Sequence, residues 1–372
     1  YTGATNANYI TNNNQLTNGA GYITTSGVAV ATSAPTGSDG QLYYNTSEDI
    51  LYCFNATKGI WEVITIQAGL VPNTVSGSQS FTTAGTFTWT VPAGVSNFAV
   101  VGVGAGSKGG DYAGGGGGGA LAYTNFVITE PSQVWNVVVG LSDTAAYPSN
   151  TGGGNTRMFS SVPNAFDILT AGGASPLGTD WNQTGYSGTQ GLGAAGGVVV
   201  AGTGGGAGGR GGHTNTGSYY APGGGGGAGG YSGAGGHGAD NTAAGASGSG
   251  GGAGGGGKAY NVNGYSVGAG GGGVGVNGQG SSGAGGVSGE SNNNQNFTIG
   301  GGAGGSGGAS APNMTYNLGN ASGGGAAGAY GGGGGAVSNN AANKSNGANG
   351  ALRIVWKSGN PTAYYFPSTN VT

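Results

Sequence analysis

The chain has 372 residues, a formal net charge of −3 and charged side chains at only 5% of positions, whereas glycine fills 97 positions. So few charges exclude the basic surface that nucleic-acid binding or an anionic membrane would require. The single cysteine, Cys53, excludes an intrachain disulfide, and we expect it to be a small buried residue. No apolar run is long enough to form a membrane-spanning helix.

Two segments precede the first long strand pattern. Residues 1–32 hold an imperfect repeat, NANYIT at 6–11 and GAGYIT at 19–24, which resembles the Tyr-Ile-Thr repeats of trimeric fibre shafts. Residues 33–72 contain GQLYYN, a hairpin and a closing tryptophan, and resemble a small β module of phage fibres. Isolated shaft repeats of this kind cannot bury their apolar residues, so the resemblance implies a homotrimer.

Residues 73–200 predict a β-sandwich framework. The string TFTWTV alternates apolar and polar residues before a Pro-Ala-Gly turn, as a half-buried strand does. Because no stretch shows a convincing helical period, we expect an all-β chain with essentially no α-helix. The last strand of the antiparallel sandwich comes from the closing segment, residues 347–372. The predicted strands are 86–91, 97–103, 122–129, 134–139, 166–171 and 351–356.

Residues 201–346 are dominated by glycine runs and lack the residues of an ordinary core. Between positions 201 and 340 the residues of the Leu, Ile, Phe, Met and Trp types are only Phe297, Ile299, Met314 and Leu318. A flexible linker would not alternate glycine runs with patches such as SYYAP and NNNQNFTI. The remaining ordered structure is a bundle of polyglycine II helices, with three residues per turn and hydrogen bonds only between neighbours.

Close packing of such helices leaves no room for Cβ atoms at the shared axes. Collagen is excluded, because a strict glycine at every third position and abundant proline are both missing. The triplets AGG YSG AGG at 228–236 suit the bundle by placing the one larger residue on an outer face. The net free energy gained from backbone hydrogen bonds is small beside the conformational entropy lost when the chain is ordered. The bundle therefore requires a framework that stabilises it.

Longer strings resemble known families. GTFTWTVPAGVSNFAVVGVGAG at 85–106, with the strings at 114–128, 135–140 and 153–159, resembles the glycine-rich domain of bacteriophage tail fibres. The closing strings NGALRIVW at 349–356 and YYFPSTN are similar to the C-terminal signature of glycine-rich structural proteins of cyanobacterial phages. The resemblance implies an extracellular virion protein that contacts other tail or virion proteins.

Seven segments interrupt the glycine runs and are the candidate binding loops. If successive helices run antiparallel, alternate segments share one end of the bundle. The first, third and fifth carry aromatic residues, the second and fourth carry none, and the sixth breaks the alternation. Aromatic faces and amides suit carbohydrate, although aromatics that cap the bundle or pack between subunits explain the same pattern. The segments are 212–222, 239–249, 258–267, 276–282, 290–299, 309–318 and 336–346, and the predicted receptor-binding residues are Tyr219, Tyr220, Tyr260, Tyr265, Asn293, Phe297 and Tyr316.

Catalysis and metal binding are poorly supported, so we expect no enzyme, no cofactor and no metal. The carboxylates of the glycine region, Asp240 and Glu290, stand 50 positions apart. His213 and His237 have no carboxylate or cysteine partner nearby in sequence, which favours exposed histidines. The calcium-type pattern GGHGAD at 235–240 occurs once, whereas such a site needs tandem repeats.

The sequence therefore predicts the distal part of a phage tail fibre, whose loops recognise a bacterial surface glycan or an outer-membrane protein. Two alternatives remain open. A structural fibre or spacer would need no receptor, and an ice-binding protein would need a flat, regular face of small residues.

Overall fold

The computed structural model describes residues 28–64, 76–110, 114–130, 132–143, 151–160, 166–177, 192–214, 222–240, 243–261, 267–291, 297–316, 324–336, 345–357 and 365–368. The chain divides into two compact units, Tyr1–Pro72 and Asn73–Thr372. The described residues form strands and extended glycine segments but no α-helix, so the expected all-β class is confirmed. They accordingly contain no helix that could span a membrane.

The first unit contains one four-stranded sheet. Its strands are β1 (Val28–Ala31), β2 (Leu42–Asn45), β3 (Ile50–Asn55) and β4 (Ile60–Val63), in the order β1-β2-β3-β4. β1 pairs parallel to β2 although it lies within the segment predicted as shaft, while both Tyr-Ile-Thr repeats lie outside the described residues.

One face of this sheet is built from aromatic rings. Tyr43 is buried and meets Trp61 edge-on, with ring centroids 5.3 Å apart, and Tyr52 stacks beside it at 5.7 Å. The predicted hairpin and closing tryptophan are therefore present. Cys53 is half buried rather than buried as expected.

The second unit begins with a sandwich of two five-stranded sheets, and the first sheet contains the C-terminal strand. Its order is β13-β8-β7-β18-β5, so the last strand of the chain lies between β7 and β5 and runs antiparallel to both. All six predicted strands of the framework are present. The other sheet has the order β12-β11-β10-β9-β6. The strands of the first sheet are β5 (Ser76–Phe81), β7 (Asn97–Val103), β8 (Leu121–Ile128), β13 (Gly204–Gly206) and β18 (Ala351–Lys357); those of the second are β6 (Gly85–Thr90), β9 (Val134–Val139), β10 (Thr156–Ser160), β11 (Phe166–Ala171) and β12 (Val199–Ala201).

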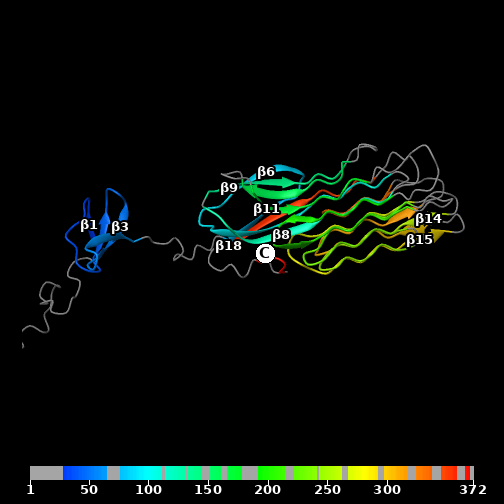
Figure 1. Cartoon of the computed structure of the whole chain (residues 1–372). Helices are drawn as coiled ribbons and strands as arrows, with labels where there is room; N and C mark the ends of the chain where they lie inside the picture. The colour runs from blue at the N-terminus through cyan, green and yellow to red at the C-terminus, as the bar shows by residue number, and fades with distance from the viewer. Residues whose placement is uncertain are drawn as a thin grey trace, which may run out of the picture. The chain divides into compact units, whose positions relative to one another are not determined.

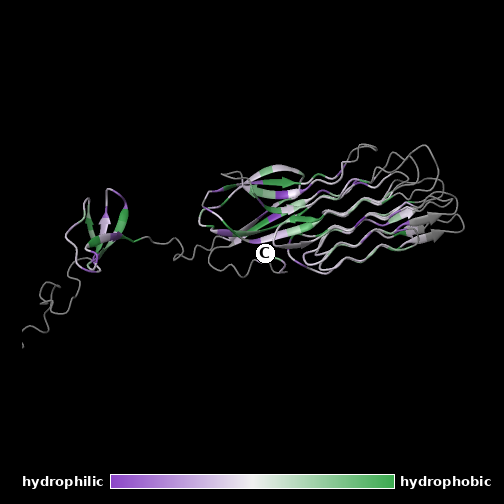
Figure 2. Cartoon of the chain, in the orientation of Figure 1, coloured by the Kyte–Doolittle hydropathy of each residue, from purple (hydrophilic) through white to green (hydrophobic). Residues whose placement is uncertain are grey.

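Large side chains fill the space between the two sheets. Trp89, Phe98 and Trp135 are buried and meet edge-on, with ring centroids 4.8 and 5.6 Å apart. Met158 and Leu169 complete this core from β10 and β11. Hydrophobic residues therefore concentrate in the sandwich, whereas the glycine segments that leave it are almost neutral in hydropathy (Figure 2).

The glycine segments form the polyglycine II bundle, and segment 223–229 shows its hydrogen bonding. Its successive N–H groups donate in turn to three different neighbouring segments, at N–O distances of 2.8 to 3.2 Å, and every third N–H donates to the same neighbour. A period of three residues is the helical repeat of this conformation. The donor–acceptor pairs are Gly224–Ala239 and Gly227–Gly236, Gly225–Ala269 and Ala228–Gly272, and Gly226–Gly116 and Gly229–Gly119.

The same segment accepts hydrogen bonds from three further segments. Gly224 accepts from Gly212, Gly225 from Gly256 and Gly226 from Gly333. Segment 223–229 thus has six hydrogen-bonded neighbours. A Cβ built on any glycine of this segment would lie closer than 3.0 Å to a neighbour's backbone, a separation that real Cβ atoms essentially never show.

The bundle contains more of the chain than residues 201–346. Segments 104–110 and 114–120 also belong to the bundle: the first follows β7 and the second precedes β8, and both hydrogen-bond to other glycine segments. Figure 1 shows glycine segments running on from the sandwich strands to a far end, where β14 (Ala259–Asn261) and β15 (Gly289–Ser291) lie. Glycine segments that directly follow β7 and directly precede β8 therefore take part in the hydrogen bonding of the bundle.

The near end of the bundle, where it meets the sandwich, is closed by aromatic residues. Tyr231 is 1% exposed and stacks on Phe366, with ring centroids 5.8 Å apart. Its hydroxyl donates to the Gly275 carbonyl and accepts from the Gly278 N–H. The expectation that Tyr231 lies on an outer face is therefore wrong: the chain turns at this residue, and the ring packs toward β8 against Tyr123.

Candidate functional site

Short strands at the far end of the bundle bring several of the predicted site residues together. β14 pairs parallel to β15, and β16 (Phe297–Ile299) pairs antiparallel to β17 (Met314–Tyr316). β15 also lies against β16. Strand residues of the third, fifth and sixth loop segments therefore share one end of the bundle, although the sequence left the position of the sixth open.

The backbone of three predicted receptor-binding residues is placed by these pairings. The backbone of Tyr260 lies opposite that of Glu290, and the backbone of Phe297 lies opposite that of Tyr316. The other four, Tyr219, Tyr220, Tyr265 and Asn293, lie outside the described residues. Their prediction as site residues stays a prediction.

The expected alternation of the loop segments is partly wrong. The fourth segment lies at the near end, since the Gln279 N–H donates to the Pro367 carbonyl beside the sandwich. The second segment was also expected at the near end. Its Ala239 instead hydrogen-bonds to Gly224, which follows the first segment, and to Gly256, which precedes the third, so the second segment begins at the far end. The reason is that the chain turns back earlier, at Tyr231 and again near Gly250, so the helices are shorter than the glycine runs suggested.

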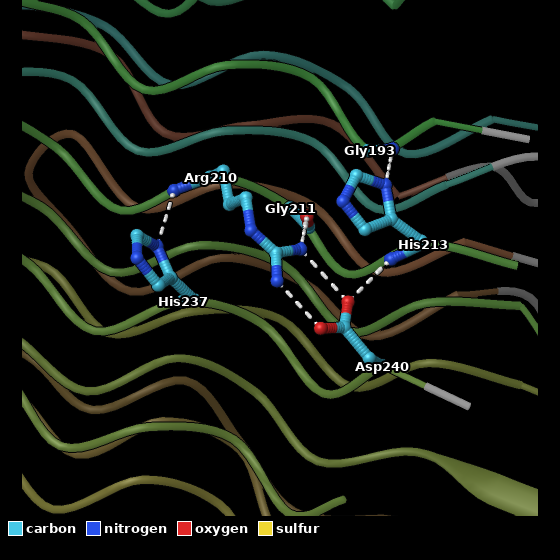
Figure 3. A network of polar contacts seen from close by, with 6 residues as sticks. All are labelled: Gly193, Arg210, Gly211, His213, His237 and Asp240. Carbon is cyan, nitrogen blue, oxygen red and sulfur yellow. Dashed lines mark hydrogen bonds and ion pairs between the residues drawn. The ribbon is translucent and has the colours of Figure 1, made fainter. Parts of the chain in front are cut away.

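An ion pair ties two bundle segments together close to the far end. Arg210 binds Asp240 with two parallel hydrogen bonds, of 2.8 Å from Nη1 to Oδ1 and 2.5 Å from Nη2 to Oδ2 (Figure 3). The Asp240 Oδ1 also accepts the His213 N–H at 2.8 Å, and the Arg210 Nη1 donates to the Gly211 carbonyl. Both charged side chains are about one-third exposed, so the pair is neither deeply buried nor fully solvated.

The two histidines flank this ion pair and bind the main chain through the same ring atom. The Nδ1 atom of His213 accepts the Gly193 N–H at 3.0 Å, and the Nδ1 atom of His237 accepts the Arg210 N–H at 3.1 Å (Figure 3). An imidazole nitrogen accepts only when it carries no proton, so each ring is neutral with its proton on Nε2. His237 is exposed as expected, whereas His213 is half buried.

The surroundings shift the titration of these groups. Burial lowers the pKa of His213, and the nearby Arg210 lowers it further, while Asp240 acts in the opposite direction. Partial desolvation and Arg210 also lower the pKa of His237. Burial alone would raise the pKa of Asp240, but its hydrogen bonds from Arg210 and from the His213 main chain lower it to about 2.

Sequence reasoning missed this network although its signal was present. Arg210 precedes His213 by three residues, and His237 precedes Asp240 by three. Three residues make one turn of a polyglycine II helix, so both members of each pair lie on one face of their helix. For His213 the nearby carboxylate, Asp240, comes from the facing segment; for His237 it lies three residues along the same segment, so the expectation that neither histidine has a carboxylate nearby in sequence is wrong for His237.

This network is not arranged as a metal centre. The Asp240 carboxylate oxygens already accept three hydrogen bonds, and both Nδ1 atoms are occupied by main-chain donors. In the part of the chain that the structure describes, no three His, Cys, Asp or Glu side chains gather as metal ligands. The arrangement is suited to holding segments in register.

Taken together, the fold defines a glycine-rich all-β protein, in which a polyglycine II bundle continues from a β-sandwich and brings the third, fifth and sixth loop segments together at its far end. The model of the glycine-rich domain family matches residues 82–274, from the second strand of the sandwich into the bundle, and the chain belongs to this family. The comparison with curated proteins gives no match.

Proposed function

We propose that this chain forms the distal part of a bacteriophage tail fibre, and that it recognises a bacterial surface receptor with the far end of its bundle. The receptor is a surface glycan or, failing that, an outer-membrane protein. In this proposal the chain acts by binding, without catalysis, and works outside the cell as part of the virion, attached to other tail or virion proteins. The resemblance to cyanobacterial phage proteins makes cyanobacteria the first hosts to test.

The observation that carries the proposal is the difference between the two ends of the bundle. The near end is covered by the sandwich and by Phe366, which is 2% exposed. The far end brings the backbones of Tyr260, Phe297 and Tyr316 into one group of short strands. Tyrosine offers a large, rigid contact face and loses little rotamer entropy on binding, which suits recognition of sugar rings.

The framework suits this role because it is fixed by backbone hydrogen bonds. Each bundle segment is held by its neighbours through a repeating N–H to carbonyl pattern, and side chains there are mostly small. Residues of the connecting segments can then change without disturbing a packed core. Binding residues in proteins concentrate on loops that a rigid scaffold positions.

Binding to whole cells tests the proposal. The purified chain and a variant with Tyr219, Tyr220, Tyr260 and Tyr265 changed to Ala are compared on cyanobacterial and other Gram-negative hosts. We expect the native chain to bind and the variant to lose binding while its circular dichroism spectrum is unchanged. Phe166→Ala, which removes a half-exposed aromatic ring from the sandwich, is the matched control and should bind like the native chain.

A purely structural fibre is the competing function, and the compact backbone lattice of the bundle is the observation that favours it. It predicts that no host cell binds the chain, or that all three proteins bind alike. Either result would contradict recognition by the far-end aromatic residues.

The proposal includes a homotrimer. In the described part of the first unit, the buried side chains are those of Tyr43 and Asn45, and the other strand residues stay half buried or exposed. So small a sheet gains stability when partner subunits cover it. Light scattering should give three times the 35.0 kDa chain mass, and a monodisperse monomer would contradict the trimer.

A further inference from the structure

The network around Arg210 and Asp240 contains two groups whose charge changes near neutral pH, and both hold the main chain. We infer that His213 and His237 form an acid-sensitive clamp, which keeps three bundle segments together at neutral pH and loosens them when the imidazoles take up protons. The clamp joins segment 192–198, through Gly193, to segment 207–214, through Arg210 and His213, and to segment 234–240, through His237 and Asp240.

The hydrogen bonds of the two rings run in one direction, from the main chain to the imidazole. Each Nδ1 atom accepts a main-chain N–H, of Gly193 in one case and of Arg210 in the other. A protonated imidazole donates from both nitrogens and accepts at neither. Protonation of either ring therefore sets a donor against a donor, and a main-chain N–H of the bundle loses its acceptor.

The charges near the rings oppose a further positive charge. Arg210 and Asp240 are the charged groups that act on both imidazoles, and His237 is a titratable neighbour of His213. The described segments hydrogen-bonded to 207–214 and 234–240 are 114–119, 192–198, 223–229, 243–249 and 252–258, and the one charged residue in them is Lys258, which would add a second cation. The Asp240 carboxylate is already bound by both guanidinium nitrogens and by the His213 N–H. A new imidazolium would thus stand beside the Arg210 cation without a free carboxylate to balance it.

The sign of the pH dependence follows from the lowered pKa of both rings. The imidazoles bind protons less tightly in the closed clamp than in the opened chain. The free energy that favours the closed clamp is therefore largest above the ordinary histidine pKa of about 6.5, and it declines as the pH falls below that value. Asp240 adds nothing in this range, because its pKa of about 2 keeps it ionised throughout. Linkage predicts that opening rises about tenfold for each pH unit and each imidazole, until the lowered pKa is reached.

Hydrogen exchange of single amides tests the clamp in the full chain. Protection factors of the Gly193 and Arg210 amides, corrected for intrinsic exchange, should fall between pH 7.5 and pH 5. The Gly226 and Gly256 amides, which donate to carbonyls of the bundle interior, are internal controls and should keep their protection. Equal protection of the Gly193 and Arg210 amides at both pH values would overturn the clamp.

A double variant separates titration from structure. In His213→Asn with His237→Asn, the amide oxygen takes the place of Nδ1 as acceptor but does not titrate, so the protection of Gly193 and Arg210 should become independent of pH. A variant that loses protection like the native chain would overturn the inference. If the variant does not fold, the native chain still decides through its imidazole NMR signals: titration below 6.5 from the Nε2–H tautomer is expected, and a midpoint above 6.5 contradicts the clamp.

One consequence rests on the proposed function. Segments 207–214 and 234–240 lead directly into connecting segments, the first of which contains Tyr219 and Tyr220. Adsorption of the native chain to a host that it binds should weaken at pH 5, whereas adsorption of the double variant should not. Lost protection with unchanged adsorption would overturn this link, and absence of adsorption at any pH would contradict the proposed function and leave the clamp standing.

Discussion

At the scale of the residue, the bundle depends on the absence of single methyl groups. Gly226 lies in the segment with six neighbours, and a Cβ at this position would lie closer than 3.0 Å to the Gly209 carbonyl oxygen. Because that obstacle is backbone, it cannot rotate away as a side chain would. We expect Gly226→Ala to lower the free energy of unfolding by about 2 kcal/mol or more, measured by denaturant unfolding.

Ala246→Ser is the matched control for this substitution. Ala246 lies in segment 243–249 of the same bundle, but its side chain is exposed. The change should stay within about 0.5 kcal/mol. Gly229→Leu and Gly304→Leu meet neighbouring backbone in the same way and should cost more than Gly226→Ala. Equal small effects at all four positions would contradict the polyglycine II lattice.

Tyr231 shows a second requirement at the residue scale, the satisfaction of main-chain groups where the helices turn. Its hydroxyl donates a hydrogen bond to the Gly275 carbonyl at 3.2 Å and accepts one from the Gly278 N–H at 3.0 Å. Tyr231→Phe leaves both buried groups without this partner, and we expect a loss of about 2 kcal/mol in thermal or chemical unfolding. Tyr123→Phe, in the same cluster, removes a hydroxyl that takes no part in these two bonds and should cost less.

The role of Tyr231 also shows what the sequence could not reveal. The triplets at 228–236 correctly indicate a three-residue repeat, but the repeat continues smoothly through YSG, where the chain reverses. Glycine carries no side-chain pattern that marks a turn. Only the contacts of Tyr231 with Tyr123 and Phe366 show that this position ends a helix.

At the scale of the element, alternation of apolar and polar residues predicted the framework strands where one face is buried. TFTWTV is such a case, whereas NFAVVGV is a nearly continuous apolar run whose residues are buried on both faces of the strand. β5 was missed because SGSQSF has one large apolar residue, Phe81, and owes its conformation to pairing with β18. The charged network was missed because its residues meet across two segments rather than within one.

The C-terminal segment acts as an element of the near end. Phe366 packs against Tyr231, and its main chain exchanges two hydrogen bonds with the Asn125 side chain, of 2.7 and 3.0 Å. These contacts place Phe366 beside Tyr231, where the chain turns at the near end of the bundle. Phe366 thus connects β8 of the sandwich, through Asn125, to the turn of the bundle at Tyr231.

We expect Phe366→Ala to destabilise the second unit by about 3 kcal/mol, because it removes a buried aromatic ring from a closed cluster. Differential scanning calorimetry measures the effect. Phe166→Ala removes the same side chain from a half-exposed position and should cost about 1 kcal/mol or less. Similar losses in the two variants would show that the C-terminal segment does not fasten the near end.

At the scale of the whole molecule, the two units have different roles in the proposed function: the second unit binds the receptor and the first unit associates with partner subunits. The core clusters of the second unit, from Phe81 to Phe366, lie entirely within Asn73–Thr372. Its sandwich supplies the hydrophobic stability that a glycine bundle lacks, and its bundle brings the third, fifth and sixth loop segments to its far end. The first unit supplies the sheet surfaces for which we propose partner subunits.

This division predicts how two fragments behave. A protein made of Asn73–Thr372 should fold alone, as judged by a cooperative unfolding transition, and should be monomeric. It should compete with the full chain for host cells, whereas Tyr1–Pro72 should not. Because a trimer engages several receptors at once, the fragment should compete about a hundredfold or more less effectively than the full chain. Competition by Tyr1–Pro72 alone would place recognition outside the bundle and contradict the proposed site.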